Sequence, residues 1–386
     1  MSGRWHRRLR RAARDRRGVA LILTVSMTVL LTAVSLEFAY ESRVELALAA
    51  NARDAMRAEF LARSAVEFSR VLIHVQKTVI DRFKKQLPFP IQIWQIVPID
   101  SELARALTSG ALGGEGLFEG ELEGFSLEGA EGFGNFQGHF FAEIIDEDRK
   151  ININMAQYKT QGQQFRGLML QLTGPAKYNF LFENPDRDGN FTDREELIAS
   201  IIDWIDADEE RSGLSAGPED DRYSTLDDPY ESKNAPLDTL HELHLVRGVN
   251  DEFMHLFGEQ LTIWGKSINL LTADAPTIAA LIRFSLPDDD PMHSPAADLQ
   301  VLELAYEFVA LRNDELLINS VKDFVNYLKA DGVNVNESKL GRVAGVESSV
   351  FTIKAVGEVG QAVTRINAVV DASQVPGGKI VYWRVD

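Results

Sequence analysis

Acidic side chains accumulate in one stretch of the sequence, directly after a segment of helical spacing that ends in Asp-Trp-Ile-Asp. The residues concerned are Asp206, Asp208, Glu219, Asp220, Asp221 and Asp228. Carboxylates this close together repel one another unless a cation neutralises some of them. Ca²⁺ takes about six to eight oxygen ligands and tolerates irregular loops, whereas Mg²⁺ requires stricter octahedral geometry. Two interpretations fit these residues equally well: a calcium site, or a solvated loop whose aspartates cap helices.

A second group of oxygen-bearing side chains precedes the same helical segment. It resembles the start of an EF-hand loop, in which ligands occupy positions 1, 3 and 5. The residues at these positions are Asp186, Asp188 and Asn190. However, Gly189 falls at position 4 rather than 6, and Leu197 stands where the loop requires a bidentate Glu. A polar turn with Asp193 as the helix N-cap explains the same residues nearly as well.

The composition limits the other kinds of chemistry. The chain has no cysteine, which excludes thiolate metal sites, disulfides and a thiol nucleophile. Its net charge is −18, but eight arginines and one aspartate lie before residue 18, so the remainder holds 32 basic against 57 acidic residues, a net charge of −25. Binding to nucleic acid depends on Lys and Arg contacts to phosphate, so we expect no nucleic-acid partner. No catalytic order of residues stands out, and we expect no enzyme.

An apolar N-terminal segment must anchor the protein. No charged residue occurs between Gly18 and Leu36, a run that as a helix reaches roughly 27 Å, just enough to cross a bilayer core. The arginines before it predict a cytoplasmic N-terminus and an exported body. A secretory signal is cut after its apolar run, whereas here a glycine stands before it. The segment is therefore either a membrane helix that follows a cleavage site at the glycine, or an ordinary signal anchor that is not cleaved.

Beyond the membrane segment, the sequence predicts a stem and two kinds of domain. Residues 36–85 contain no proline and show helical spacing, which predicts one continuous amphipathic helix of about 65 residues together with the apolar run. Residues 139–154 predict a β-hairpin with a polar tip at 146–148, and residues 350–360, 362–371 and 379–385 predict strands that cover the apolar stripe of the stem. Helical spacing dominates residues 155 to about 330, at 168–172, 194–207, 237–245, 251–257, 277–284 and 298–309.

Two parts of the sequence resemble known families. The arginine-rich start with Gly18 before an apolar helix resembles the leader of type IV prepilins. The series Asp-Trp-Ile-Asp (203–206), Tyr223, Pro229-Tyr230 and Asn-Ala-Pro (234–236), followed by Glu242 to Val249, is similar to the minor pseudopilin K family of type II secretion systems. In pilins the fifth mature residue is usually Glu, whereas here it is Leu23. The K family also lacks this carboxylate.

The resemblance implies a fold, a position and partners. It implies an α+β fold with a pilin-like long N-terminal helix packed on an antiparallel sheet and a large all-α domain inserted. Prepilin peptidase would cut between Gly18 and Val19, and Leu23 would suit a subunit at the tip of the pseudopilus rather than a repeating one. The implied partners are the minor pseudopilins H, I and J and the major pseudopilin. The protein would cross the inner membrane once, with its body in the periplasm, and would help to initiate assembly and protein export.

The same resemblance sets the expected domains and favours calcium. We expect a leader (1–18), a membrane segment (19–37), a first pilin-like part (38–154) with a glycine- and glutamate-rich loop (109–138), an α domain (155–337) and C-terminal strands (338–386). The metal-stabilised α domain of the family makes Ca²⁺ the favoured occupant of the acidic loops. Two alternatives of other classes are a signal-anchored periplasmic calcium-binding protein or enzyme, and a DNA-uptake component with helix-hairpin-helix folds near 245–249 and 268–273.

Overall fold

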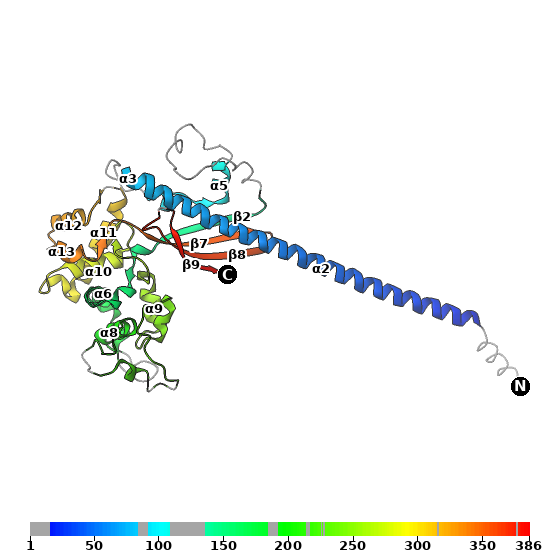
Figure 1. The fold of residues 1–386 in the computed structure, drawn as a ribbon, viewed down its shortest axis with the longest axis horizontal. Coiled ribbons are helices and arrows are strands. Elements are labelled where there is room, and N and C mark those ends of the chain that lie inside the picture. The colour runs from blue at the N-terminus through cyan, green and yellow to red at the C-terminus, as the bar shows by residue number, and fades with distance from the viewer. Residues whose placement is uncertain are drawn as a thin grey trace.

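The long stem is a single helix. The structure, a computed structural model, describes residues 16–83, 92–108, 136–183, 192–213, 217–224, 226, 228–314, 316–375 and 377–386. Helix α2 (Arg16–Val75) has 60 residues, about 90 Å at ~1.5 Å per residue, and continues as the π-helical segment η1 (Gln76–Ile80) and α3 (Asp81–Phe83). Its first part has a mean hydropathy of 2.3 over 18 residues and extends freely away from the body (Figure 1). The predicted stem helix is confirmed.

A five-stranded antiparallel sheet lies along the far half of the stem. Its strand order is β1 (Ile99–Asp100), β2 (His139–Asp146), β7 (Val350–Val359), β8 (Ala362–Asp371) and β9 (Lys379–Val385). The short helices α4 (Ile93–Ile96) and α5 (Ser101–Thr108) precede β2. The three C-terminal strands were predicted and are confirmed. The glycine- and glutamate-rich loop lies outside the described residues except for its last three positions.

The stem approaches the sheet closely because small residues line the contact. Ala58, Ala62 and Ala65 are fully buried, and α2 packs on β2, β7 and β8. A Cβ at Gly357 of β7 would lie only 2.0 Å from the Ala58 carbonyl oxygen, so only glycine fits there. Alternate residues of β7, such as Phe351, are buried against the helix.

The sheet does not cover the whole apolar stripe of the stem. Four large apolar residues nearer the membrane segment remain more than 60% exposed: Leu46, Leu48, Met56 and Phe60. The prediction that the strands bury the whole stripe is therefore wrong for these residues. For Leu46 and Leu48 the reason is length, because the β7–β8 hairpin ends near Asp54, where Gly360 turns with a φ of +60°. Met56 and Phe60 lie alongside the sheet but on a different side of the helix from the fully buried Ala58 and Ala62.

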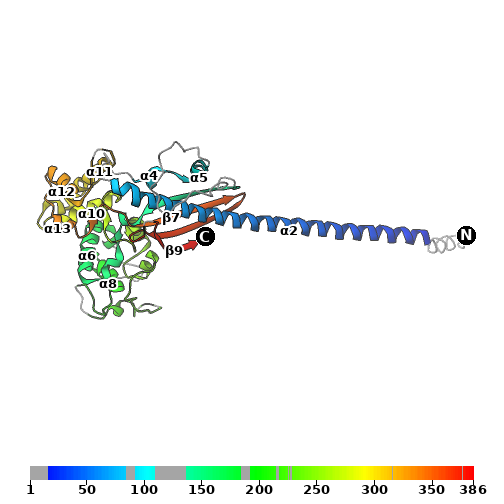
Figure 2. The ribbon, with the colours of Figure 1, turned by 45° about the horizontal axis from the view of Figure 1, so that its top comes forward.

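The α domain lies at the end of the stem opposite the N-terminus (Figures 1 and 2). Its core includes the fully buried Phe165, Ile201, Leu281 and Phe308, and no described residue of this core belongs to the core between stem and sheet. The segment predicted as a helix at 237–245 is instead the 3-10 helix η6 (Leu240–Leu245). The helices are α6 (Lys159–Thr173), α7 (Phe180–Glu183), α8 (Arg194–Ile205), α9 (Asp251–Phe257), α10 (Ala275–Ser285), α11 (Asp298–Asp314), α12 (Val321–Ala330) and α13 (Glu337–Leu340).

The predicted hairpin at 139–154 is wrong. Strand β2 ends at Asp146, and the chain turns through the 3-10 helix η2 (Glu147–Arg149) into β3 (Ile151–Asn152). Strand β3 pairs in parallel with β4 (Leu261–Thr262), and β5 (Ile268–Asn269) pairs in parallel with β6 (Ala344–Gly345). The turn forms because the Asp146 side chain accepts a hydrogen bond from the Asp148 N–H and caps η2. Consequently residues 139–146, and not 147–154, share the sheet with the C-terminal strands.

Three consecutive carboxylates are buried at this turn. Asp146, Glu147 and Asp148, which we name the joint carboxylates, are 3%, 5% and 2% exposed. All six of their side-chain oxygens accept hydrogen bonds from protein groups. Burial and the neighbouring Asp148 carboxylate raise the pKa of Asp146 to about 6, although the hydroxyls of Ser348 and Thr272 oppose that shift. The sequence places these residues at a solvated hairpin tip, whereas the fold places them at the junction of two domains.

Candidate metal site and family

Helix α8 positions the first part of the acidic loop. Asp193 caps its N-terminus, accepting a hydrogen bond from the Glu196 N–H at 2.8 Å. Every residue from Leu197 to Ile205 is buried, so the helix is fixed within the core of the α domain. The backbone becomes extended at Asp206, with φ −74° and ψ 168°, and ends the helix there. Asp206 and Asp208 therefore stand at the C-terminal end of a rigid helix.

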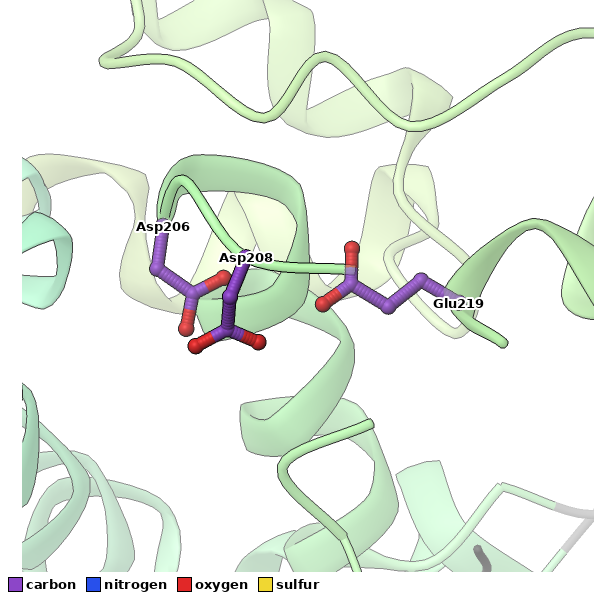
Figure 3. A group of neighbouring side chains, drawn as sticks. All are labelled: Asp206, Asp208 and Glu219. Carbon is purple, nitrogen blue, oxygen red and sulfur yellow. The ribbon is translucent and has the colours of Figure 1, made fainter. Parts of the chain in front are cut away.

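A short 3-10 turn brings the third carboxylate. Turn η5 (Glu219–Arg222) follows Pro218 and places Glu219 opposite the end of α8. Asp206, Asp208 and Glu219 each offer a carboxylate oxygen, and these oxygens lie within 4.8 Å of one another. Figure 3 shows the three side chains gathered around one region of space. We name this group the loop triad.

The protein supplies the loop triad with few hydrogen-bond donors. Glu219 is only 2% exposed, yet its Oε1 has no partner among the described residues, and its Oε2 lies 3.4 Å from the Ser232 hydroxyl. Asp206 Oδ1 is also buried and has no hydrogen-bond partner in the described parts of the chain. Asp208 Oδ1 accepts a hydrogen bond from the Glu210 N–H at 3.0 Å. Buried polar atoms in native proteins nearly always have partners, so these two oxygens have room for a bound cation or an ordered water.

Burial and mutual repulsion raise the pKa values in the loop triad. Burial, with the neighbouring Asp208 and Asp203, raises the pKa of Asp206 to about 7. Burial, with Asp203, Asp206 and Asp208, raises the pKa of Glu219 to about 8. A divalent cation bound between these oxygens would remove both the repulsion and the desolvation penalty. Carboxylate oxygens are ligands that Ca²⁺ and Mg²⁺ prefer, so the donor set fits a hard cation.

A buried arginine holds the two halves of the site together. Arg222 donates from Nη1 to Asp203 Oδ2 at 2.6 Å and from Nη2 to Glu196 Oε1 at 2.9 Å. Both acceptors belong to α8, so the turn that carries Glu219 is fixed against the helix. Asp203 Oδ1 also accepts a hydrogen bond from the Ser212 N–H at 2.7 Å. Burial raises the pKa of Asp203, although Ser212 and Arg222 oppose the shift. Sequence reasoning missed Arg222; a cation directly after the three acids Glu219, Asp220 and Asp221 was the available signal.

The other predicted ligands lie apart from the loop triad. Asp220 accepts hydrogen bonds from the Ser232 N–H and hydroxyl, both at 2.8 Å. Asp221 is exposed, with Oδ2 3.9 Å from Arg211 Nη2, and Asp228 is exposed as well. The second predicted group, Asp186, Asp188 and Asn190, lies outside the described residues.

The residues predicted for cleavage and assembly lie on the membrane segment. Gly18, Val19 and Leu23 occupy the start of helix α2, and all three are exposed. Leu23 is 64% exposed and presents an apolar side chain on this helix. The uncharged helix from Gly18 is long and apolar enough to cross a membrane.

Comparison with known families finds a match in the first part of the α domain. Residues 149–265 match the family model of type II secretion system protein K, described as its first domain. This stretch begins in η2, includes α6 and α8, and contains the whole loop triad. This part of the chain is similar to the minor pseudopilin K family of type II secretion systems. The apolar helix that begins at Gly18, together with this similarity to a type II secretion component, supports a single-pass membrane-anchored protein.

Among solved structures, a crystal structure of a secretion complex is similar to this chain. It is the crystal structure of the GspK-GspI-GspJ complex from the enterotoxigenic Escherichia coli type 2 secretion system. The similarity covers 65% of this chain and 80% of that chain, at 17% sequence identity and a TM-score of 0.44. A comparison with curated proteins finds no match.

Proposed function

We propose that this chain is the tip subunit of a type II secretion pseudopilus, where it helps to start assembly and thereby protein export. The observation that carries the proposal is the position of the α domain at the end of the stem opposite the membrane segment (Figure 2). A further subunit stacked above it along the same axis would meet that domain. Because its α domain occupies that position, the chain described here can end a fibre but cannot be repeated along it.

The membrane segment supports the same position. Prepilin peptidase would cut after Gly18 and leave Val19 as the first mature residue, with Leu23 as the fifth. A charge in lipid is costly unless it is paired, and the pilin Glu at this place answers the α-amino group of a neighbouring subunit. A subunit with Leu23 offers no such partner, which suits the first position of a fibre. The arginines before Gly18 favour insertion in the inner membrane with the body in the periplasm.

The proposed partners are the minor pseudopilins H, I and J and the major pseudopilin. The similar solved structure is a complex of GspK with GspI and GspJ. In this chain the exposed part of the stem between the membrane segment and the sheet carries small residues. These are Ala47, Ala49 and Ala52, beside the half-buried Ala50. Small residues allow helices to approach closely, so helix-on-helix contacts along this part of the stem would join the subunits.

Two experiments test the proposed position and processing. Filaments purified after co-expression with the other pseudopilins are labelled with an antibody against the α domain. We expect label at one end only, and label along the filament would contradict the tip position. Mass spectrometry of the chain after co-expression with prepilin peptidase should give a mature N-terminus at Val19. An intact Met1, or a cut after Leu36, would contradict the pseudopilin processing.

We also propose that the loop triad binds Ca²⁺ through Asp206, Asp208 and Glu219. The proposal is supported by the convergence of three carboxylates on a rigid helix end and by the buried Glu219 oxygen without a partner. Ca²⁺ tolerates the irregular geometry of such a loop better than Mg²⁺ does. The ion would connect the end of α8 to η5 and so stabilise the domain. We propose no catalytic role and no nucleic-acid partner.

A further inference from the structure

The two domains of this chain meet across a polar layer. Their hydrophobic cores share no described residue, and the chain passes from one to the other at 146–151 and back at 345–350. Two neighbouring crossings of this kind form a natural hinge, since a few residues at the ends of elements can absorb a rotation. A domain attached in this way keeps a fixed angle only if other contacts brace the crossings.

The joint carboxylates supply these contacts. Each of the three accepts hydrogen bonds both from residues 262–272 of the α domain and from the segment 348–352 that leads into β7. The donors are Asn269, Thr272 and Ser348 to Asp146, Thr262 and Thr352 to Glu147, and Lys266, Ser349 and Val350 to Asp148.

The geometry of the α-domain loop is adapted to this contact. Gly265 has a φ of +81°, and a Cβ there would lie 2.4 Å from Asp148 Oδ1. Its carbonyl oxygen accepts a hydrogen bond from Asn152 Nδ2 at 2.7 Å, which ties the loop to the outgoing crossing as well. Within the network the one cationic side chain among the described partners is Lys150, which pairs with Glu147 at 3.0 Å. The remaining bonds come from neutral donors.

We propose that Asp146, Glu147 and Asp148 form an orientation lock that fixes the angle of the α domain on the stem and sheet. Hydrogen bonds to carboxylates are directional and about twice as strong as those between neutral groups, so three of them at one turn define a single geometry. An apolar contact of the same area would hold the domains together without selecting one angle. The lock goes beyond the proposed tip function and does not depend on it.

The absence of cysteine allows a direct test. Spin labels are placed at two exposed positions, Ala52→Cys on the stem and Gln300→Cys on α11, in the full chain in detergent. Pulsed electron resonance then gives the distribution of distances between the two labels. The measurement is made at pH 8, where Asp146, with its pKa raised to about 6, is ionised. We expect one narrow distribution for the chain with intact joint carboxylates.

Two variants remove different numbers of hydrogen bonds from the orientation lock. Asp148→Ala removes the acceptor of the Ser349 and Val350 N–H groups, and the milder double variant Thr272→Val with Ser348→Ala removes two hydroxyl donors to Asp146. We expect a distribution wider than that of the unmodified chain in both, with helical circular dichroism unchanged in the double variant. Asp289→Ala, an exposed acid of the same domain, is the matched control and should leave the width unchanged.

The outcome decides the proposal without reference to assembly. A distribution that stays narrow in the folded double variant, and in Asp148→Ala if that variant folds, overturns the orientation lock. A widened distribution with an unchanged control supports it. Because the measurement uses the isolated chain, a negative result would not affect the proposed position at the tip. Equally, antibody label found along the filaments would contradict the tip position but would not affect the orientation lock.

Discussion

The molecule contains two groups of three neighbouring carboxylates, and they differ in burial and in what surrounds them: all three joint carboxylates are buried, whereas in the loop triad Glu219 is buried, Asp206 is half-buried and Asp208 is exposed. The joint carboxylates meet protein donors at all six oxygens, from backbone N–H groups, hydroxyls, an amide and one lysine. The loop triad has two buried oxygens that no described residue supplies with a hydrogen bond, and burial raises the pKa values of Asp206 and Glu219 to about 7 and 8. The number of acids is the same. The supply of donors separates a structural network from a candidate cation site, because an unmet buried oxygen needs a ligand.

The largest expected effect comes from breaking the joint. Asp148→Ala leaves the buried N–H groups of Ser349 and Val350 without an acceptor, and each unsatisfied donor is costly. We expect the free energy of unfolding to fall by roughly 3 kcal/mol. Urea unfolding of the full chain in detergent, followed by tryptophan fluorescence, measures it. The exposed control Asp289→Ala should change the value by less than about 0.5 kcal/mol, and an equal effect of both variants would contradict the donor argument.

Removing the cation should affect the loop triad alone. A ligand present at 100 times its Kd stabilises the folded state by about 2.7 kcal/mol, so a chelator should lower the Tm of the calcium-loaded chain. In the variant Glu219→Gln we expect the Tm to be the same with calcium and with chelator. Differential scanning calorimetry gives both values. If the chelator leaves the Tm of the unmodified chain unchanged, the acidic loop is simply solvated.

The two groups should respond with opposite sign when a charge is removed in the absence of a cation. The pKa values of Asp206 and Glu219 are raised, so these carboxyls lower the stability of the folded state once pH exceeds about 7 and 8, and the penalty disappears as they take up protons at lower pH. In chelator at pH 9, Asp206→Asn and Glu219→Gln should therefore raise the Tm, and at pH 6 the gain should be lost. Asp148→Asn should lower the Tm at both pH values. A loss of Tm in the loop-triad variants at pH 9 would mean that their carboxylates are satisfied after all.

The smallest effect is expected at the acids that the fold leaves apart. Asp228 is exposed and lies outside the loop triad, so Asp228→Asn should change the free energy of calcium binding by less than about 0.5 kcal/mol. Isothermal titration calorimetry with Ca²⁺ compares it with the unmodified chain. A loss of affinity comparable to that of Glu219→Gln would place Asp228 among the ligands and enlarge the site.

Local patterns in the sequence were sufficient for most elements of the fold. The uncharged run after Gly18 and the proline-free stretch that follows predict the stem, and period-two alternation predicts β7, β8 and β9. These signals are reliable because the side of a helix or strand that is buried repeats at its own period. The hairpin at 139–154 failed for the same reason: alternation at Ile151 and Ile153 reports burial but does not name the strand that pairs.

The two acidic groups mark the limit of sequence reasoning. The sequence by itself determined that this chain has an apolar segment of membrane length, an acidic remainder and carboxylates in excess around residues 206–228. Only the tertiary structure decided that Asp206, Asp208 and Glu219 converge while Asp220 turns to Ser232, and that Asp146 meets Ser348. The physical reason is that a carboxylate in solution is satisfied by water, and needs a protein donor or a cation only when packing removes that water. Packing brings together segments that lie far apart along the chain, so the sequence alone does not show which partner a carboxylate will have.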